Sequence, residues 1–314
     1  MTILITGIHG FIGSNLSTAL CNQHSIYGLD IIFPIKEEVI CTFGWNEFEK
    51  IPPSDAIIHL AGMAHYTVNQ SQIAKYFEIN VGLTKIIFDH FLKSDAKKFI
   101  FFSSVKAVTD SVRNNILTED DIPNPQTPYG QSKLSAENYI LNQPLPPGKH
   151  IYILRPAMIH GPGNRGNLNL LYNLMSRGIP YPLGAFENQR SFTSIGNLNY
   201  IIEQFLEKDI PSGIYQVADS ESLSTNEIIT LIANVRGQKP KIWKVPVKLV
   251  KIVARLGDFF CFPFNSEKLK KLTENYLVSN KKITDAIGVT LPITARDGLL
   301  VTLTSFQSKE VDKL

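Results

Sequence analysis

Three glycines spaced three residues apart, directly after a short apolar run, constrain this chain more than any other feature. Residues 3–5 are apolar, Gly7, Gly10 and Gly13 follow, and residues 11–20 have the spacing of an amphipathic helix. This order predicts a strand, a tight glycine turn and a helix. Gly7 permits the turn, Gly10 lets a ligand approach the backbone, and Gly13 lets the helix pack on the strand. The N–H groups at the start of such a helix favour an anion such as a pyrophosphate.

Asp30 extends this pattern to a dinucleotide site. It ends a second strand-like run, residues 25–29, about twenty residues after the glycines, where a carboxylate binds ribose hydroxyls. The same carboxylate repels a 2′-phosphate, and residues 31–35 contain no arginine that would accept one. We therefore predict NAD, rather than NADP, as the cofactor.

The rest of the chain predicts an α/β fold. Further apolar strands are expected near residues 55–61, 97–103, 151–154 and 214–218, with helices at 73–92 and 129–141 between them. Continuous apolar runs that alternate with helices are typical of a parallel sheet covered on both faces. The prediction is a Rossmann-type doubly wound parallel sheet with a smaller, mostly C-terminal α/β substrate domain. We place the NAD-binding domain at residues 1–165, with parts of 190–220 returning to it, and the substrate-binding domain mainly at 166–314.

Composition excludes several classes of function. The 314 residues carry a formal net charge of only +3 and show no basic stripe with interleaved aromatics, so nucleic acid is not an expected partner. Cys21, Cys41 and Cys261 match no metal-ligand spacing, so no metal site is predicted, and each is expected to be a small core residue. The chain begins on a strand without a signal-like run, and we expect a cytoplasmic protein.

Two C-terminal features are interpreted as structural. The cluster Lys268, Lys270 and Lys271 is expected on a solvated helix face. Residues 247–260 read as an amphipathic helix whose apolar face packs in the smaller domain, in preference to docking on a membrane or a partner enzyme. Membrane association is therefore not expected.

Tyr129 and Lys133 are the candidate catalytic pair. At i and i+4 they lie one helical turn apart on the same face. A free tyrosine has a pKa near ~10, and a neighbouring ammonium group together with an oxidised nicotinamide would lower it. Ser104, at the end of a predicted strand, is placed to hydrogen-bond the same substrate oxygen, and Asn80 to hold a water or a backbone group.

With these residues in this order, the sequence resembles the extended short-chain dehydrogenase/reductases that act on nucleotide sugars. The resemblance covers residues 1 to about 200. It rests on the glycine turn and on four further motifs, residues 59–62 (HLAG), 80–84 (NVGLT), 128–133 (PYGQSK) and 154–156 (LRP).

The resemblance implies roles for individual residues. Tyr129 is the acid/base on a sugar hydroxyl, Lys133 lowers its pKa, and Ser104 assists by hydrogen bonding. The implied NAD-binding residues are Gly7, Gly10, Phe11, Ile12, Gly13, Asp30, Leu60, Ala61, Gly62, Asn80, Ser103, Tyr129, Lys133 and Pro156. The implied substrate-binding residues are Ser104, Lys106, Tyr129, Met158, Asn167 and Arg190. A homodimer through the helices at 73–92 and 129–141 is also implied.

The reaction within this family is narrowed by two residues. Similar 4,6-dehydratases carry Asp-Glu just after the serine, whereas this chain has Val105 and Lys106, which cannot supply that acid and base. The chain instead resembles a bacterial subgroup of UDP-sugar 4-epimerases and 4-keto-sugar reductases of surface-polysaccharide pathways. In that match Asn167 and Arg190 hold the nucleotide diphosphate, for which a planar guanidinium is suited. Lys106 has two open readings, toward the substrate or toward solvent.

Two departures leave the sugar open. Met158 stands where many members place an Asn that touches the substrate, and Gly196 stands where a loop Asp is usual. The leading hypothesis is an NAD-dependent 4-epimerase of a UDP-hexose or UDP-N-acetylhexosamine, acting through a transient 4-keto sugar. The alternatives are an NAD(P)H-dependent 4-keto-sugar reductase and, third, a non-catalytic dinucleotide-binding protein on the same fold.

Overall fold

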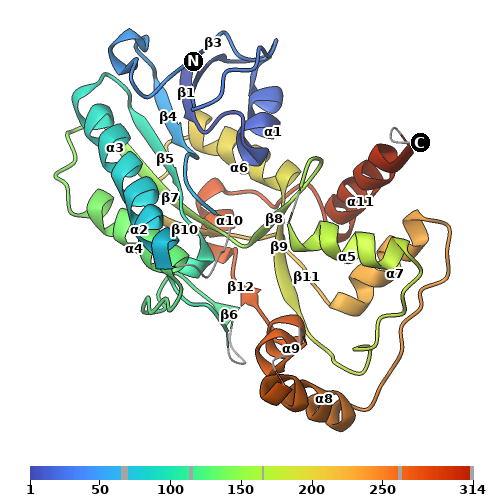
Figure 1. Cartoon of the computed structure of the whole chain (residues 1–314). Helices are drawn as coiled ribbons and strands as arrows, with labels where there is room; N and C mark the ends of the chain where they lie inside the picture. Colours follow the sequence, from blue (N-terminus) through green and yellow to red (C-terminus); the bar gives the residue numbers. More distant parts are fainter. Residues whose placement is uncertain (65–69, 113–115, 165, 261–263, 312–314) are drawn as a thin grey trace.

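The computed structural model describes residues 1–64, 70–112, 116–164, 166–260 and 264–311, and its main feature is one parallel sheet (Figure 1). Among these residues, seven strands form the sheet in the order β10-β7-β5-β4-β1-β2-β3. Their bounds are β1 Thr2–Thr6, β2 Ser25–Leu29, β3 Cys41–Phe43, β4 Ala56–His59, β5 Lys98–Phe102, β7 His150–Pro156 and β10 Gly213–Val217. Every neighbouring pair is parallel, so all carboxyl ends share one edge. This is the predicted doubly wound Rossmann-type sheet.

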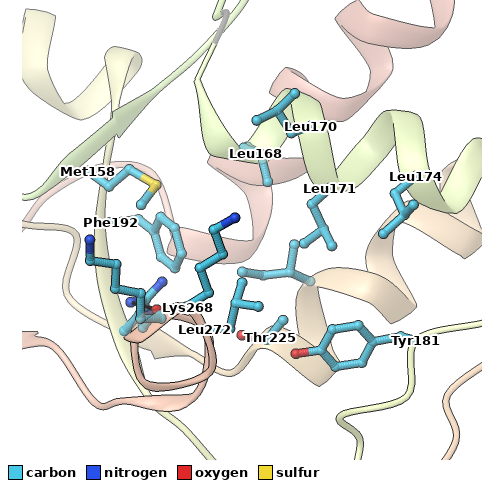
Figure 2. A pocket seen from close by; sticks show the side chains of 13 residues that line it. Met158, Leu168, Leu170, Leu171, Leu174, Tyr181, Phe192, Thr225, Lys268 and Leu272 are labelled. Atoms are coloured by element: carbon cyan, nitrogen blue, oxygen red, sulfur yellow. Dashed lines mark hydrogen bonds between the residues drawn. The ribbon is translucent and has the colours of Figure 1, made fainter. Parts of the chain in front are cut away.

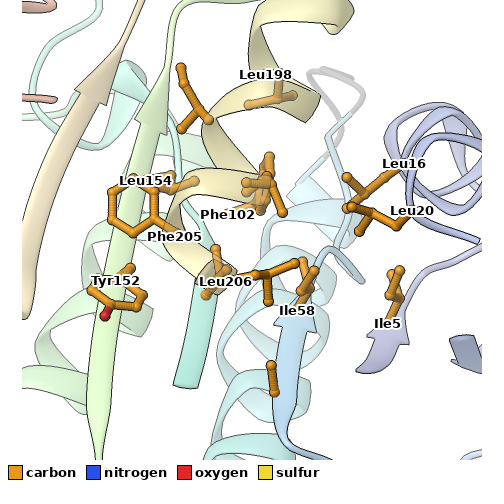
Figure 3. Close-up of a cluster of buried hydrophobic side chains, with 14 of the residues drawn as sticks. Ile5, Leu16, Leu20, Ile58, Phe102, Tyr152, Leu154, Leu198, Phe205 and Leu206 are labelled. Carbon is orange, nitrogen blue, oxygen red and sulfur yellow. The ribbon is translucent and has the colours of Figure 1, made fainter. Parts of the chain in front are cut away.

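Helices cover both faces of this sheet. On one face lie α1 (Phe11–Leu20), α6 (Ile195–Glu207) and α10 (Lys281–Ile287), whose apolar side chains form a core with the inward residues of the strands (Figure 3). On the other face α3 (Leu83–Lys93) and α4 (Pro128–Leu141) pack on the alternate residues of the same strands. Because both faces are covered, the central strands contain uninterrupted apolar runs.

The helix expected at residues 73–92 is interrupted. The structure divides it into α2 (Gln70–Phe77), a π-helical turn at Glu78–Gly82, and α3. Asn80 lies in the π-helical turn and is buried. Such turns are often found at functional sites, and here the extra residue directs Asn80 toward the end of β4.

A second, smaller core lies mostly in the C-terminal part of the chain. It is formed by α5 (Asn167–Ser176), α7 (Thr225–Val235), α8 (Val247–Phe260), α9 (Ser266–Thr273) and α11 (Ala295–Val311). A three-stranded sheet of β8 (Met158–His160), β9 (Arg190–Ser194) and β11 (Ser222–Leu223) packs with them. The short strands β6 (Ile116–Leu117) and β12 (Leu277–Val278) pair with each other. The division of the chain into two domains at residue 165 stays a proposal. In it, α6 and β10 belong to the NAD-binding domain, because α6 packs on the larger sheet and β10 is one of its strands.

Two expectations from the sequence were wrong, one for the packing of helix α8 and one for the burial of a cysteine. Only Val250, Ala254 and Gly257 of α8 are buried, so most of its apolar side chains do not pack in the smaller domain. Cys41 is exposed and therefore is not a core residue, whereas Cys21 is half-buried and packs against the larger core. Cys261 lies outside the described residues. No helix in the described ranges is long and apolar enough to cross a membrane.

Candidate active site

The glycine turn has the geometry predicted for it. Gly7 has φ +68°, a conformation that favours glycine, and a Cβ there would lie 2.8 Å from the Ala61 nitrogen. A Cβ at Gly13 would lie 2.5 Å from the Gly7 oxygen, so α1 packs directly on the turn. Gly10 is the N-cap of α1, and Phe11 and Ile12 are its first two residues. Because a glycine N-cap has no side chain, it offers no side-chain oxygen to the first N–H groups of the helix.

Asp30 lies beside this turn, as predicted. One carboxylate oxygen accepts a hydrogen bond from the His9 nitrogen at 2.9 Å, and the other accepts one from the Ile31 nitrogen at 2.7 Å. A backbone cradle that any Cβ would fill, next to a fixed carboxylate, fits a dinucleotide with its pyrophosphate on α1 and its ribose on Asp30.

The residues after β4 form the next part of the site. Leu60, Ala61 and Gly62 follow the strand, and the Ala61 nitrogen donates to the Thr6 hydroxyl at 3.1 Å. Asn80 accepts from the Met63 nitrogen at 2.7 Å and donates to the Ser132 hydroxyl at 2.9 Å. Asn80 therefore holds a backbone group and ties the end of β4 to α4.

The start of α4 is held from the loop before it. Thr127 caps the helix by accepting from the Gly130 nitrogen at 3.3 Å, and Asp110 accepts from the Thr127 nitrogen at 3.0 Å. A Cβ at Gly130 would lie 2.3 Å from the Lys106 oxygen, so only a glycine lets α4 approach the segment after β5 so closely. These contacts bring Tyr129 next to Ser104.

Lys133 is buried one turn further along α4. Its Nζ donates to the Phe102 oxygen at 2.8 Å, and a Cβ at Gly62 would lie 3.3 Å from that Nζ. Burial lowers the pKa of Lys133 to about 8, with the charge of Glu137 acting in the opposite direction. The ammonium group therefore lies at the carboxyl edge of the sheet, between β4 and β5.

The pKa of Tyr129 is raised in the protein without NAD. Burial raises the pKa of this phenol above its ordinary value, and a hydrogen bond with the Ser104 side chain only partly offsets the rise. Loss of water disfavours the phenolate, and the Lys133 Nζ donates to a backbone carbonyl. The lowering of this pKa by Lys133 together with an oxidised nicotinamide stays a prediction for the protein with NAD bound. We refer to Tyr129, Lys133 and Ser104, together with the glycine turn, as the catalytic corner.

Ser103 has a role that the sequence did not predict. Its hydroxyl donates to Glu137, which also binds Arg155 through two hydrogen bonds of 2.9 and 2.6 Å. Glu137 and Arg155 are both buried. This network ties α4 to β5 and β7 beneath Lys133, so the Ser103 side chain supports the helix. Pro156, at the end of β7, pairs with Val217 of β10.

A cavity of about 500 Å³ lies beside α9, and we call it the α9 cavity (Figure 2). Its walls are mainly apolar side chains of α5, β8, β9 and α7, with basic side chains along the α9 side. The lining residues are Met158, Leu168, Leu170, Leu171, Leu174, Tyr181, Arg190, Phe192, Thr225, Ile228, Lys268, Lys271 and Leu272. Met158 and Arg190 are thus in one cavity, whereas the side chain of Asn167 lies outside the described residues.

The positive charge of the α9 cavity comes partly from residues that the sequence analysis assigned to solvent. Arg190 donates to the Lys271 backbone oxygen at 2.7 Å, and burial lowers its pKa. Lys268 and Lys271 line the cavity beside it and are also exposed, as predicted for a solvated helix face, and Lys271 forms an ion pair with Glu267 at 2.7 Å. Because these lysines lie about eighty residues from Arg190 in the sequence, no local sequence pattern predicts that the three side chains line one cavity.

Lys106 lies between the two parts of the site. Its Nζ donates to the Asp110 oxygen at 2.7 Å and lies 4.5 Å from the centre of the Tyr276 ring. Burial lowers the pKa of Lys106, and nearby Arg190 and Lys271 contribute to the lowering. The Lys106 side chain is thus partly buried near Arg190, and its role toward the substrate stays a prediction.

Comparison with known proteins agrees with this geometry. The model of the NAD dependent epimerase/dehydratase family matches residues 3–218, and the chain belongs to this family. It is similar to the UDP-glucose 4-epimerase of Vibrio cholerae, with 27% identity over 97% of this chain and 95% of the relative. It is also similar to the N-acetyl-alpha-D-glucosaminyl-diphospho-ditrans,octacis-undecaprenol 4-epimerase of Escherichia coli O157:H7, with 26% identity over 90% and 84%. Sugar-nucleotide reductases match as well.

The fold is shared with solved structures. The UDP-glucuronic acid 4-epimerase of Bacillus cereus, crystallised with NAD, has a TM-score of 0.73 and 20% identity over 98% of this chain and 99% of that one. The chain is thus a member of an NAD-dependent enzyme family of the extended short-chain dehydrogenase/reductase type, as its sequence motifs predicted.

Proposed function

We propose that this protein is a 4-epimerase of a sugar carried on a diphosphate, with a UDP-hexose or UDP-N-acetylhexosamine as the expected substrate in surface-polysaccharide synthesis. One observation supports this most strongly: Tyr129 is hydrogen-bonded to Ser104 and lies one helical turn from Lys133, at the end of the sheet that carries the glycine turn. This is the arrangement needed to take a proton from a sugar hydroxyl while a hydride leaves the same carbon.

The residues of the chain divide the chemistry among them. NAD, which the glycine turn and Asp30 would hold, would supply a reversible hydride acceptor for C4. Tyr129, as a phenolate stabilised by Lys133 and the positive charge of oxidised NAD, would take the proton of the C4 hydroxyl and become the phenol. It would give that proton back to the 4-keto oxygen when the hydride returns to the opposite face. Ser104 donates a hydrogen bond to that oxygen, and the Lys133 ammonium group stabilises the phenolate as the proton moves. Electrons and protons balance over one cycle, so no external oxidant or reductant is consumed.

The residues beside Ser104 support this reaction over 4,6-dehydration. Val105 is buried and apolar, and the Lys106 ammonium group donates to a backbone oxygen. Neither supplies the carboxylate pair that removal of a hydroxyl needs. A keto-sugar reductase would use the same catalytic corner in one direction, and it is the alternative outcome of the test below.

The α9 cavity supports a diphosphate as the carrier of the sugar. Arg190, Lys268 and Lys271 bring three positive charges to one wall, and an arginine side chain suits phosphate oxygens in particular. The opposite wall is formed by leucines of α5. Since one relative acts on an undecaprenol-linked sugar diphosphate, a lipid-linked sugar is the second candidate substrate class.

The test is liquid chromatography that separates C4 epimers, with mass spectrometry of the nucleotide sugars, after incubation of the protein with a panel of UDP-sugars, with and without added NADH. Interconversion of two C4 epimers without added cofactor is the expected result. Stoichiometric consumption of NADH with a 4-keto sugar would instead show that the protein is a reductase. If the protein turned over no sugar diphosphate, the remaining hypothesis would be a non-catalytic dinucleotide-binding protein. We also propose a homodimer through the helices at 73–92 and 129–141, which size-exclusion chromatography with light scattering tests.

A further inference from the structure

Helix α8 lies at the periphery of the smaller domain (Figure 1). Most of its apolar side chains are exposed. Phe259 is 81% exposed, and the other apolar side chains of this face are each more than half exposed: Leu249, Ile252, Val253, Leu256 and Phe260. Folded proteins rarely leave such a contiguous apolar face in water, so the face is suited to a partner.

The exposed side chains form one stripe along the helix. At about 100° per residue, Ile252 and Phe259 lie on the side opposite the buried Val250, Ala254 and Gly257. The other exposed apolar side chains, Leu249, Val253, Leu256 and Phe260, lie next to them, between the two sides. The buried side is made of small residues that let α8 approach the chain before α9, where a Cβ at Gly257 would lie 1.9 Å from the Phe264 oxygen. The helix is therefore fixed to the protein by its narrow side, and its large apolar side faces outward.

Basic residues flank the apolar stripe. Lys248, Lys251 and Arg255 are exposed along one edge of it, and the acidic residue of α8, Asp258, accepts a hydrogen bond from the Ser266 nitrogen at 2.9 Å. Residues 239–271 contain nine Lys or Arg and two Asp or Glu, so this stretch alone is more positive than the whole chain, which is +3. An apolar face bordered by lysine and arginine is the pattern of a helix that lies in the surface of an anionic bilayer.

We propose that α8 docks the protein on the surface of an anionic lipid bilayer, with its helix axis parallel to the membrane plane. The apolar stripe enters the region between headgroups and acyl chains, and Lys248, Lys251 and Arg255 bind lipid phosphates. This proposal departs from the expectation that membrane association is unlikely, which assumed that the apolar face of α8 packs inside the protein. A second copy of this chain would bring the same excess of positive charge to the contact and would be repelled by it.

Docking through α8 also orients the proposed substrate site. Helix α9 packs on α8, and Lys268, Lys271 and Leu272 of α9 line the α9 cavity. The cavity is thus separated from the bilayer-facing helix by a single helix. A protein held in this way would meet sugar diphosphates at the membrane surface.

Flotation with lipid vesicles tests the proposal on the full chain with NAD present. Vesicles of phosphatidylcholine with about 30% phosphatidylglycerol should carry the protein, whereas pure phosphatidylcholine should carry little, and high salt should weaken the binding. The variant L249S/L256S/F259S should lose about tenfold or more in vesicle partitioning. A matched control, I122S/V301S, also removes exposed apolar side chains but lies away from α8 and should bind like the wild type.

A second variant locates the contact. Phe259→Trp should show a blue-shifted fluorescence increment with anionic vesicles, quenched by brominated lipid, while circular dichroism stays that of the wild type. Failure of the wild type to float with anionic vesicles at low salt would overturn the proposal. So would equal flotation of the triple variant, or an α8-dependent dimer that forms without any vesicle binding. Because flotation needs no turnover, loss of the docking proposal leaves the proposed epimerase untouched, and an inactive protein that floats overturns only the epimerase.

Discussion

The catalytic corner and the α9 cavity differ in how the chain builds them. In the catalytic corner, backbone carbonyls, capping residues and the buried Glu137–Arg155 pair fix each side chain from below. In the α9 cavity, side chains from five elements meet around an apolar space, and Met158 and Leu170 remain 36% and 67% exposed.

This contrast suits the two regions to different tasks, the catalytic corner to the reaction and the α9 cavity to recognition of the substrate. A proton transfer needs donor and acceptor held at hydrogen-bond distance, which a buried and fully bonded corner provides. Recognition of a diphosphate and its carrier depends on wall shape and charge, which can vary without disturbing the corner. The two regions should therefore respond differently to substitution.

The largest effect is expected at the corner. Tyr129→Phe keeps the ring and its contact with Tyr76 but removes the proton carrier, so kcat should fall by about 10²–10⁴-fold while NAD stays bound. Initial rates and the nucleotide content of the purified variant measure the two quantities. A loss smaller than about tenfold would show that the corner does not carry the chemistry.

Loss of the buried Glu137–Arg155 pair, which supports the catalytic corner, should lower the free energy of unfolding. Glu137→Gln leaves the Arg155 guanidinium buried without a charged partner, and about 3–5 kcal/mol of the free energy of unfolding should be lost. Asp285→Asn breaks an exposed pair with Lys281 and should cost about 0–1 kcal/mol. Denaturant unfolding compares the two variants, and equal losses would mean that the network does not hold α4.

A substitution in the α9 cavity should change KM more than kcat. Arg190→Gln removes a guanidinium from the basic wall, and loss of hydrogen bonds to a charged group of about 1.5–3 kcal/mol corresponds to a rise in KM of about 10–100-fold with kcat nearly unchanged. Lys239→Gln removes an exposed positive charge elsewhere and serves as the control. A fall in kcat with unchanged KM would move Arg190 from recognition to the reaction.

The smallest effect is a pH dependence. Burial lowers the pKa of Lys133 to about 8, so its charge is lost as pH rises through that value rather than near its ordinary one. Since the ammonium group stabilises the phenolate, kcat should fall about fivefold between pH 8 and about pH 9. Lys133→Arg keeps the charge and should remove this alkaline limb, if the variant retains measurable turnover; a limb that persists in it would belong to another group.

The same contrast explains what the sequence could predict. The glycine turn, Asp30 and the Tyr129–Lys133 spacing are local patterns whose geometry follows from short stretches of backbone, and their positions were correct. The parallel sheet was equally predictable, because buried strands such as Ile57–Ile58 and Phe99–Phe102 are uninterrupted apolar runs.

What escaped prediction depends on contacts between distant residues. Lys271 joins Arg190 through a backbone oxygen, and Glu137 joins Arg155 and Ser103 across three elements. The raised pKa of Tyr129 follows from burial, which i,i+4 spacing does not report. For α8, periodicity identified the apolar face, but only the packed structure reveals that this face points outward.

The fate of a deuterium atom at C4 tests the central claim most directly. The protein is incubated with a UDP-sugar deuterated at C4, without added cofactor, and both epimers are analysed by mass spectrometry and NMR. Because Tyr129 moves only the hydroxyl proton, the account predicts that the deuterium returns to C4 of the product epimer with inverted configuration. Loss of the deuterium to water, or inversion at a different carbon, would contradict it.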